Sequence, residues 1–481
     1  MNNSRAFFNL SKSSYVHYII IFLIEICFRW IPPFGAMSEG GMAVLGVFVG
    51  TIYGWLALSN MGITSLIGII MMGTTFMFPG GPTESFVAAI GNTNTLRVLA
   101  CFGVAGLMNL SGTSTYLAKK IVGSKLGRKS PVLLCALFMI AAIIIGPFVS
   151  FATLILLWDM WRAVCDTLKA PSSYLKYGIG CIMIAFCLAN QCFPFVPMVV
   201  TLDGMWTGTT GLPPAPFLNF VVYMLIMAII VCILWLLIGR RMLKIDLPDT
   251  KDVHIEKDKA TPYQIYCIIC IIVYAVLLCI AGMNVGPASA VLASWGLIGF
   301  SIMMLIITLI LAPAGSPKSF HEIMSKSLNW DLLATMGMVM LLSSTVGSEE
   351  VGLGATLAGA LSGLNSLGPV AFAIIIMIIP TVLTQYLNNL TMGVIFIPIC
   401  YTLGHAQGLN VVALNCCIYM LTSVALASPS GSLGSAMYYE CEEIDKPTGY
   451  KSGWLFTILC IIVAIICFFA LGNVFFPNGK V

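Results

Sequence analysis

Small polar residues gather where long apolar stretches of this chain are interrupted. The richer clusters lie in the second half, at Thr384–Thr391 (TQYLNNLT) and Ser428–Ser435 (SPSGSLGS). Sparser clusters lie in the first half, at Ser150–Thr153 (SFAT) and Asn190–Pro197 (NQCFPFVP). Gly and Pro in three of the four clusters or beside them disfavour a continuous helix, so we expect an unwound backbone there.

An unwound stretch between apolar helices can hold two kinds of ion. A helix that starts inside an apolar interior leaves free N–H groups and a positive dipole end at the break, and both favour an anion such as a carboxylate. Main-chain carbonyls, with oxygens of Ser, Thr and Asn, suit a dehydrated Na⁺. The second-half clusters therefore predict an anion and cation site, to which the first half can add Ser150, Thr153, Asn190 and Gln191.

The composition places these clusters in a membrane. Of 481 residues, 59% are hydrophobic and 9% are charged, with a net charge of +4, whereas soluble domains carry about 25% charged residues. Such a chain cannot cover a water-facing surface, and its scattered basic residues argue against nucleic-acid binding. Apolar runs of this length exclude an outer-membrane barrel. The sequence therefore predicts an all-α polytopic membrane protein embedded in the lipid bilayer.

The hydropathy pattern predicts about eleven transmembrane helices and two re-entrant hairpins. The stretches 131–168 and 367–404 are too long for one helix, and polar or small residues interrupt each near its middle. Non-helical backbone at that depth is tolerated only where protein or a wet cavity surrounds it. This topology puts 20 of the 23 Lys and Arg on one side, so the positive-inside rule predicts a cytoplasmic N-terminus, a C-terminus outside and a cell (inner) membrane location.

The two halves resemble each other at a steady offset. Gly103 corresponds to Gly337, Ser150 to Asn388, and Leu188-Ala189 to Leu426-Ala427. An odd number of crossings separates equivalent points, so the copies are inverted, and inverted repeats with broken helices are typical of secondary transporters. The predicted organisation is an N-terminal tail and first span (1–38), repeat 1 (39–244), a cytoplasmic linker (245–262) and repeat 2 (263–481).

Several motifs resemble the divalent-anion:sodium symporter family of the ion transporter superfamily. That family carries Ser-Asn-Thr at each hairpin tip and a Pro some ten residues later, and here Asn388-Asn389-Leu390 and Pro398 take those places. The stretch Met324–Leu333 followed by Gly337 looks like the family's approach to its ninth span. The resemblance implies an elevator-type homodimer that takes up a di- or tricarboxylate-like anion with Na⁺.

The resemblance also divides the candidate ligands by role. Asn389, Thr384 and the Gly431 backbone match the family's second sodium site, and Ser428 joins them as a cation ligand. The residues assigned to the substrate are Ser150, Thr153, Asn190, Asn388, Thr391, Ser430 and Ser432. Phe151, Ala152 and Leu390 depart from the tip signature, so the first hairpin is divergent, and a substrate unlike a dicarboxylate or coupling to fewer Na⁺ or to H⁺ is open.

The remaining chemistry-bearing residues predict no cofactor beyond Na⁺ as the coupling ion. The four His are scattered, and most of the 17 Cys lie within apolar runs as packing residues. Asp159 and Arg162, three apart, are expected to pair on one helix face. No phosphate loop, zinc protease motif or serine elbow is present, so the sequence predicts no enzyme. The alternatives are an H⁺-coupled or antiporting anion permease and, less favoured, a membrane-integral protein that transports nothing.

Overall fold

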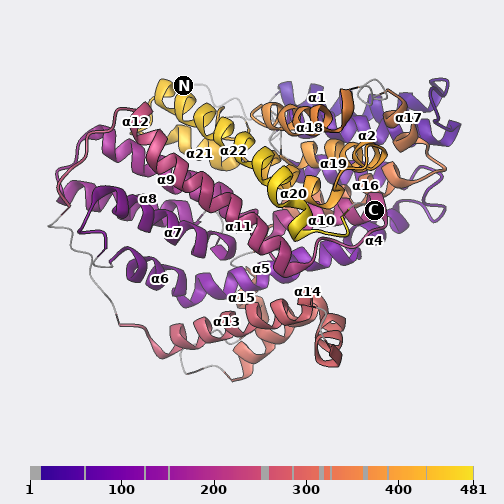
Figure 1. Ribbon diagram of the computed structural model, residues 1–481. Coiled ribbons are helices and arrows are strands. Elements are labelled where there is room, and N and C mark those ends of the chain that lie inside the picture. Colours follow the sequence, from indigo (N-terminus) through magenta and orange to yellow (C-terminus); the bar gives the residue numbers. More distant parts are fainter. Residues whose placement is uncertain are drawn as a thin grey trace, which may run out of the picture. The chain divides into compact units, whose positions relative to one another are not determined.

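The computed structural model describes residues 12–58, 61–123, 126–149, 152–250, 259–283, 286–311, 313, 319–325, 328–360, 367–386, 389–428 and 431–479. Every regular element in these ranges is a helix (Figure 1), which confirms the all-α fold class. The chain forms two compact units, and each draws on both halves of the sequence. Unit 1 comprises 1–96, 204–213 and 329–366, and unit 2 comprises 97–203, 214–328 and 367–481.

Unit 1 packs apolar helices around a few buried polar bonds. The Ser38 hydroxyl caps the second helix by accepting a hydrogen bond from the Gly41 N–H at 2.9 Å. The indole of Trp55 donates to Ser65, whose hydroxyl lies 3.2 Å from that of Thr335. The helices of this unit are α1 (Lys12–Cys27), the short 3₁₀ helix η1 (Phe28–Trp30), α2 (Glu39–Ala57), α3 (Met61–Met72), α4 (Pro82–Ile90), α16 (Trp330–Gly347) and α17 (Leu353–Ala360).

Unit 2 holds all four polar clusters. Two helices, α5 (Thr93–Ser111) and α10 (Pro197–Thr210), belong partly to each unit. The others are α6 (Thr113–Val122), α7 (Pro131–Val149), α8 (Ala152–Thr167), α9 (Ser172–Ala189), α11 (Phe217–Leu234), the π-helix η2 (Trp235–Gly239), α12 (Arg240–Met242), α13 (Pro262–Met283), α14 (Gly286–Ile310), α15 (Phe320–Ser325), α18 (Gly368–Leu383), α19 (Asn389–Ala406), α20 (Val411–Thr422), α21 (Leu433–Glu440) and α22 (Lys446–Phe475).

The same order of elements occurs twice in unit 2. A helix with a Pro near its end (Pro147 in α7, Pro380 in α18) is followed by a gap and a packed partner helix, α8 or α19. A third helix then ends in a non-helical stretch, after which come a short helix (α10 or α21) and a long one (α11 or α22). Helices α7, α8 and α9 lie side by side (Figure 1). Each predicted hairpin is thus a helix–break–helix pair, and its re-entrant path stays a prediction.

Four helices are long and apolar enough to cross a membrane among the residues searched: Glu39–Ala57, Ser172–Ala189, Phe217–Met242 and Lys446–Phe475. The number rises to six if two bent pairs each form one span, Val98–Met108 with Thr113–Val122 and Ala290–Gly296 with Ile298–Ile310. The second pair bends by 85° at Gly296, whose φ of 58° favours glycine. The total of about eleven crossings stays a prediction. The stretch 201–216 contains no Lys or Arg, and its hydropathy predicts a loop on the outside, but it is helical as far as Thr210.

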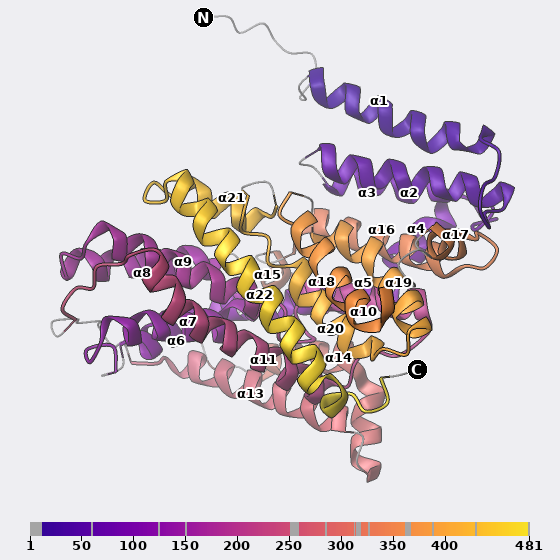
Figure 2. The same cartoon turned by 45° about the horizontal axis from the view of Figure 1, so that its top comes forward.

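The long helix α22 runs past α18 and α20 (Figure 2) and is held at its C-terminal end. Asn219 on α11 donates to the Phe475 carbonyl at 2.6 Å. Asn410, the N-cap of α20, donates to the Phe476 carbonyl at 2.7 Å and accepts from the Ala413 N–H at 3.0 Å. Because a buried asparagine must satisfy its amide, these bonds fix α22 against α11 and α20.

Candidate functional site

The central feature of unit 2 is a buried stretch of non-helical backbone, Ser423–Ser428, between α20 and α21. Each of its six side chains is at most 7% exposed. Buried N–H and C=O groups that lack a helical partner must be paired in another way, because an unpaired one costs free energy comparable to a lost hydrogen bond. The sequence predicted that the non-helical backbone begins at Ser428, whereas in the structure it begins five residues earlier, at Ser423.

The side chain of Gln385 pairs with this stretch. Its Oε1 accepts hydrogen bonds from the N–H groups of Leu426 at 3.1 Å and Ala427 at 2.8 Å. Its Nε2 donates to the carbonyls of Val424 at 3.2 Å and Thr381 at 2.9 Å. Gln385 is fully buried, so its amide replaces the missing helical partners of the stretch and ties it to the end of α18.

The far end of the stretch is held by α21 and α22. Ser432 caps α21, accepting from the Ser435 N–H at 3.0 Å, and it donates to the Ala425 carbonyl at 3.2 Å. The Ser435 hydroxyl donates to the Ser428 carbonyl at 2.5 Å. At Gly453 a Cβ would lie 2.3 Å from the Leu426 carbonyl oxygen. Only glycine there lets α22 approach so closely.

Oxygen atoms of the second hairpin gather beside the unwound stretch. The Thr384 hydroxyl lies 2.6 Å from the Thr422 carbonyl oxygen and 2.8 Å from Oδ1 of Asn389. A hydroxyl has one proton, so it can donate to only one of these two acceptors. A Cβ at Gly431 would lie 2.8 Å and 3.0 Å from the carbonyl oxygens of Gln385 and Thr384. The arrangement is rich in acceptors and therefore suits a cation.

The structure brings together the second-half candidates that it describes. Thr384, Asn389, Ser428, Gly431 and Ser432 all lie at the unwound stretch or at the tip that contacts it. The outcome for the others differs: Asn388 and Ser430 lie outside the described residues, and Thr391 is described only as part of the α19 backbone.

The first-half break has a different hydrogen-bonding pattern. Thr153, in the first turn of α8, is fully buried, and no partner for its hydroxyl is found among the described residues. Gln191 is 2% exposed, and its Oε1 is likewise unpaired within the described ranges. Asn190 is half-buried where α9 ends. Ser150 lies outside the described residues, and a meeting of the two tips stays a prediction.

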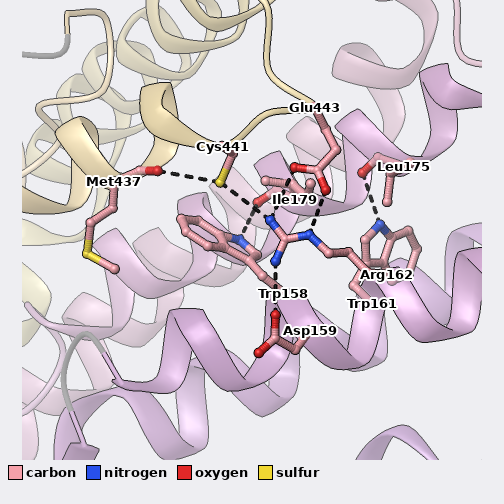
Figure 3. Close-up of polar contacts among 9 residues, drawn as sticks. All are labelled: Trp158, Asp159, Trp161, Arg162, Leu175, Ile179, Met437, Cys441 and Glu443. Carbon is pink, nitrogen blue, oxygen red and sulfur yellow. Dashed lines mark hydrogen bonds and ion pairs between the residues drawn. The ribbon is translucent and has the colours of Figure 1, made fainter.

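Ion pairs join the two repeats at one end of unit 2 (Figure 3). Arg162 on α8 contacts Glu443 through Nε at 2.6 Å and Nη2 at 3.1 Å, and contacts Asp159 at 2.9 Å. The Asp159 contact confirms the expected pair. Lys176 on α9 pairs with Asp445, which caps α22. The hydrogen bond from Arg162 lowers the pKa of Glu443, and that from Lys176 lowers the pKa of Asp445 to about 2.

Two tryptophans fasten α8 to α9 beside these ion pairs. The indole N–H groups of Trp158 and Trp161 donate to the carbonyls of Ile179 at 3.2 Å and Leu175 at 3.0 Å (Figure 3). Trp161 is fully buried. A Cβ at Gly178 would lie 1.9 Å from the Trp161 ring, so glycine allows the ring to pack against α9. The Trp161 ring is therefore a packing element between two helices.

Two features of the site were not assigned from sequence. Gln385 stood inside the polar cluster, but its pairing with the main chain of a segment some forty residues later has no local signal. The partners of Arg162 and Lys176 had a weak sequence signal. Glu443 and Asp445 are acidic residues in a segment that is predicted to lie on the cytoplasmic side, which carries most of the Lys and Arg.

Comparisons with known proteins agree with this fold. The YdaH transporter of Alcanivorax borkumensis is similar in structure, with a TM-score of 0.54 and 13% identity over 87% of this chain and 89% of that chain. MtrF of Neisseria gonorrhoeae, described within a class of antimetabolite efflux pumps, has a TM-score of 0.56 and 12% identity over 97% and 96%. No curated protein matches in sequence. At these identities the two structures show a shared fold.

A family model described as "Citrate transporter" matches residues 48–424. The match covers most of the chain, including both helix–break–helix pairs and the Gln385 side chain. This multi-pass membrane protein therefore belongs to the citrate transporter family.

Proposed function

We propose that the protein is a secondary active transporter that moves citrate or a closely related small carboxylate anion, coupled to Na⁺. The observation that carries this proposal is the buried, unwound backbone at Ser423–Ser428, held by Gln385 within a chain of the citrate transporter family. Non-helical backbone in a membrane protein occurs where it lines a cavity or is enclosed by protein, and in transporters such breaks hold substrate and coupling ions.

The break supplies positive dipole ends for the anion. Helix α19 begins at Asn389 and α21 begins at Leu433, so both start beside the unwound stretch. Their first N–H groups have no helical acceptor and carry partial positive charge. In the first half, the hydroxyl of Thr153 and Oε1 of Gln191 add neutral polar groups that have no partner among the described residues. A carboxylate can use such groups without a buried lysine or arginine.

The oxygens around Thr384 supply the proposed cation site. Oδ1 of Asn389 and the Thr422 carbonyl oxygen lie 2.8 Å and 2.6 Å from its hydroxyl. Na⁺ is a hard cation that prefers oxygen ligands. The single hydroxyl proton of Thr384 can pair with only one of the two acceptor oxygens, and a bound cation would interact favourably with both. The same oxygens are close to Gln385, so occupancy by Na⁺ would order the stretch on which the anion depends. That is a physical basis for coupling.

We further propose an elevator-type motion and a homodimer in the cell membrane. Both hairpins and both breaks belong to the same compact unit, unit 2. A transporter that carries its site across the membrane needs its binding elements in a single body, and this division supplies one. Light scattering on the detergent-solubilised protein tests the dimer, and crosslinking of engineered cysteine pairs in two transport states tests the motion.

An H⁺-coupled permease is the second candidate, because a carboxylate lies near the site. Tyr419 on α20 donates to Asp203 on α10 at 3.0 Å, and α10 directly follows the first-half break. Ionisable residues within membrane-spanning regions often mark proton pathways. The structural similarity to MtrF adds export as an alternative direction.

Uptake of labelled citrate into proteoliposomes tests the proposal. A Na⁺ gradient at equal pH should drive accumulation, whereas a pH gradient without Na⁺ should not. Asn389→Ala should abolish Na⁺-driven uptake, and the control Asn329→Ala, which removes a helix cap in unit 1, should retain it. Uptake driven by pH alone and lost in Asp203→Asn would favour proton coupling. Efflux from loaded vesicles without uptake would favour export, and the absence of flux across a broad anion panel would overturn the transporter proposal.

A further inference from the structure

A cavity of about 390 Å³ lies at the end of unit 2 that carries the ion pairs. Its lining includes three lysines, Lys176, Lys244 and Lys451, which come from α9, the turn after α12, and α22. These positions are far apart in the sequence, and all fall in segments that the positive-inside rule assigns to the cytoplasmic side. The cavity is therefore assembled by the fold from basic segments of both repeats.

The charge of this cavity is only partly balanced by protein. Lys176 is paired with Asp445. Neither Lys244 nor Lys451 takes part in an ion pair among the described residues. Lys244 also holds a φ of +51°, a conformation that costs a non-glycine residue free energy. Two uncompensated ammonium groups thus face a common space, so the cavity favours an anion.

Hydroxyl groups complete the polar lining. Ser173, in the first turn of α9, lines the cavity; its hydroxyl accepts from the Asp246 N–H and can still donate. Thr448, in the first turn of α22, also lines it, but its hydroxyl donates to Asp445 at 2.9 Å. Ser452 lines the cavity as well, although its side chain is only 2% exposed. Hydroxyls and ammonium groups are the usual partners of phosphate oxygens, since both can donate.

The rim of the cavity is apolar and open to the surroundings. Met242, which lines the cavity, is 63% exposed, and the apolar residues Leu243 and Ile245 line it as well. Exposed apolar side chains beside a basic pocket match a ligand with a charged head and a hydrocarbon tail. Basic pockets between helices on the cytoplasmic side of membrane proteins bind the headgroups of anionic lipids.

We infer that this cavity, the Lys176–Lys244–Lys451 pocket, binds a phosphate group, and the apolar rim favours the headgroup of an anionic phospholipid over a soluble phosphate. Lys176 of this pocket pairs with Asp445, and that ion pair joins α9 to the N-terminus of α22. A bound phosphate would therefore strengthen the connection between the two repeats at this end. It acts apart from the unwound stretch, so it is a binding site for a structural or regulatory ligand.

The test is binding to the purified full-length protein. Native mass spectrometry and thermal unfolding are recorded in detergent with added phosphatidylglycerol or cardiolipin, with phosphatidylcholine, and with inorganic phosphate. The test variants are Lys244→Gln, Lys451→Gln and the double variant, none of which removes an ion pair found within the described ranges. The control is Lys259→Gln, an exposed lysine of the linker that does not line the pocket. Lys451→Arg keeps the charge.

Anionic lipid should bind and raise the thermal midpoint, and phosphatidylcholine should not. Each Lys→Gln change should weaken lipid binding about fivefold and the double variant about 25-fold, while Lys451→Arg and Lys259→Gln bind as the wild type does. Stabilisation by inorganic phosphate that requires the same lysines would support the phosphate site and assign a soluble source. Equal lipid binding by the wild type and the double variant, with both variants correctly folded by size-exclusion profile, would overturn the inference.

Discussion

The two breaks of unit 2 occupy equivalent places in the repeat and satisfy their polar groups in opposite ways. In the second half, the amide of Gln385 makes four hydrogen bonds with the main chain. In the first half, Oε1 of Gln191 and the hydroxyl of Thr153 are buried without a partner among the described residues. A buried unpaired polar atom costs about 1–3 kcal/mol.

This contrast indicates different roles for the two repeats in stability and in solute binding. Protein side chains pair much of the unwound backbone of the second-half break, although the Ser423 hydroxyl is buried without a partner among the described residues. In the first half, the hydroxyl of Thr153 and Oε1 of Gln191 are paired by none of the described residues, so a bound solute that pairs with them would recover free energy. We therefore expect substitutions in the second half to damage folding and cation dependence together, and substitutions in the first half to damage solute affinity with little loss of stability.

The largest expected difference is between Gln385→Ala and Gln191→Ala. The first variant strands the buried N–H groups of Leu426 and Ala427 and the carbonyl of Val424, at about 1–3 kcal/mol each. Its thermal midpoint in detergent should fall sharply and uptake should reach background. Gln191→Ala should keep a midpoint near that of the wild type and raise the KM for citrate. Equal destabilisation by both changes would refute the division.

A smaller difference is expected between Gly431→Ala and Gly146→Ala. The new Cβ at 431 would meet main-chain oxygens at 2.8 Å and 3.0 Å, whereas at 146 the nearest atom belongs to the Phe186 ring at 3.3 Å. A ring can shift and a backbone carbonyl cannot easily do so. Na⁺-driven uptake should fall roughly tenfold in the first variant, which is about 1.4 kcal/mol, and change little in the second. The measurement is the initial rate of Na⁺-driven uptake by each variant at saturating citrate.

Thr384→Val and Thr153→Val compare two buried hydroxyls of equal size. The Thr384 hydroxyl has two oxygen neighbours, so its loss should raise the half-saturating Na⁺ concentration about tenfold. The Thr153 hydroxyl has no partner within the described residues, so replacing it with a methyl group should leave the thermal midpoint equal or higher. The KM for citrate should nevertheless rise severalfold. A lower midpoint for Thr153→Val would show that its hydroxyl is paired in the folded protein.

The smallest effect concerns the ion pairs that join the repeats. The folded pKa of Asp445 is depressed to about 2, below its usual value of about 3.9. Its stabilising contribution is therefore fully present above pH 4 and is lost as the pH falls towards 2. Asp445→Asn should lower the thermal midpoint slightly and by the same amount from pH 5 to pH 8, and the difference should shrink below pH 4. A difference that varies between pH 6 and pH 8 would contradict this assignment.

The helical fold and the two helix–break–helix pairs follow from hydropathy and from local Gly, Pro and polar residues, so the sequence could predict them. The same local signals place five second-half candidates beside one another, and their binding roles stay predictions. The sequence could not predict the role of Gln385, since hydrogen bonds to Leu426 and Ala427 depend on how α18 and α20 pack. For the same reason the sequence could not predict that Trp161 packs against Gly178, because a tryptophan at the membrane edge has the same local sequence signal.

Helix α22 is fastened near both ends, and this has a mechanical consequence. Asp445 and Gly453 hold its start to α9 and to the unwound stretch, and Asn219 and Asn410 hold its end. From Gly453 to Phe475 the helix extends about 33 Å, so a tilt of about 10° at one end would displace the other by about 6 Å. The asparagine anchors oppose such a tilt. The helix therefore acts as a rigid connection. A shift of the unwound stretch on ligand binding would be passed through α22 to its contacts with α9, α11 and α20.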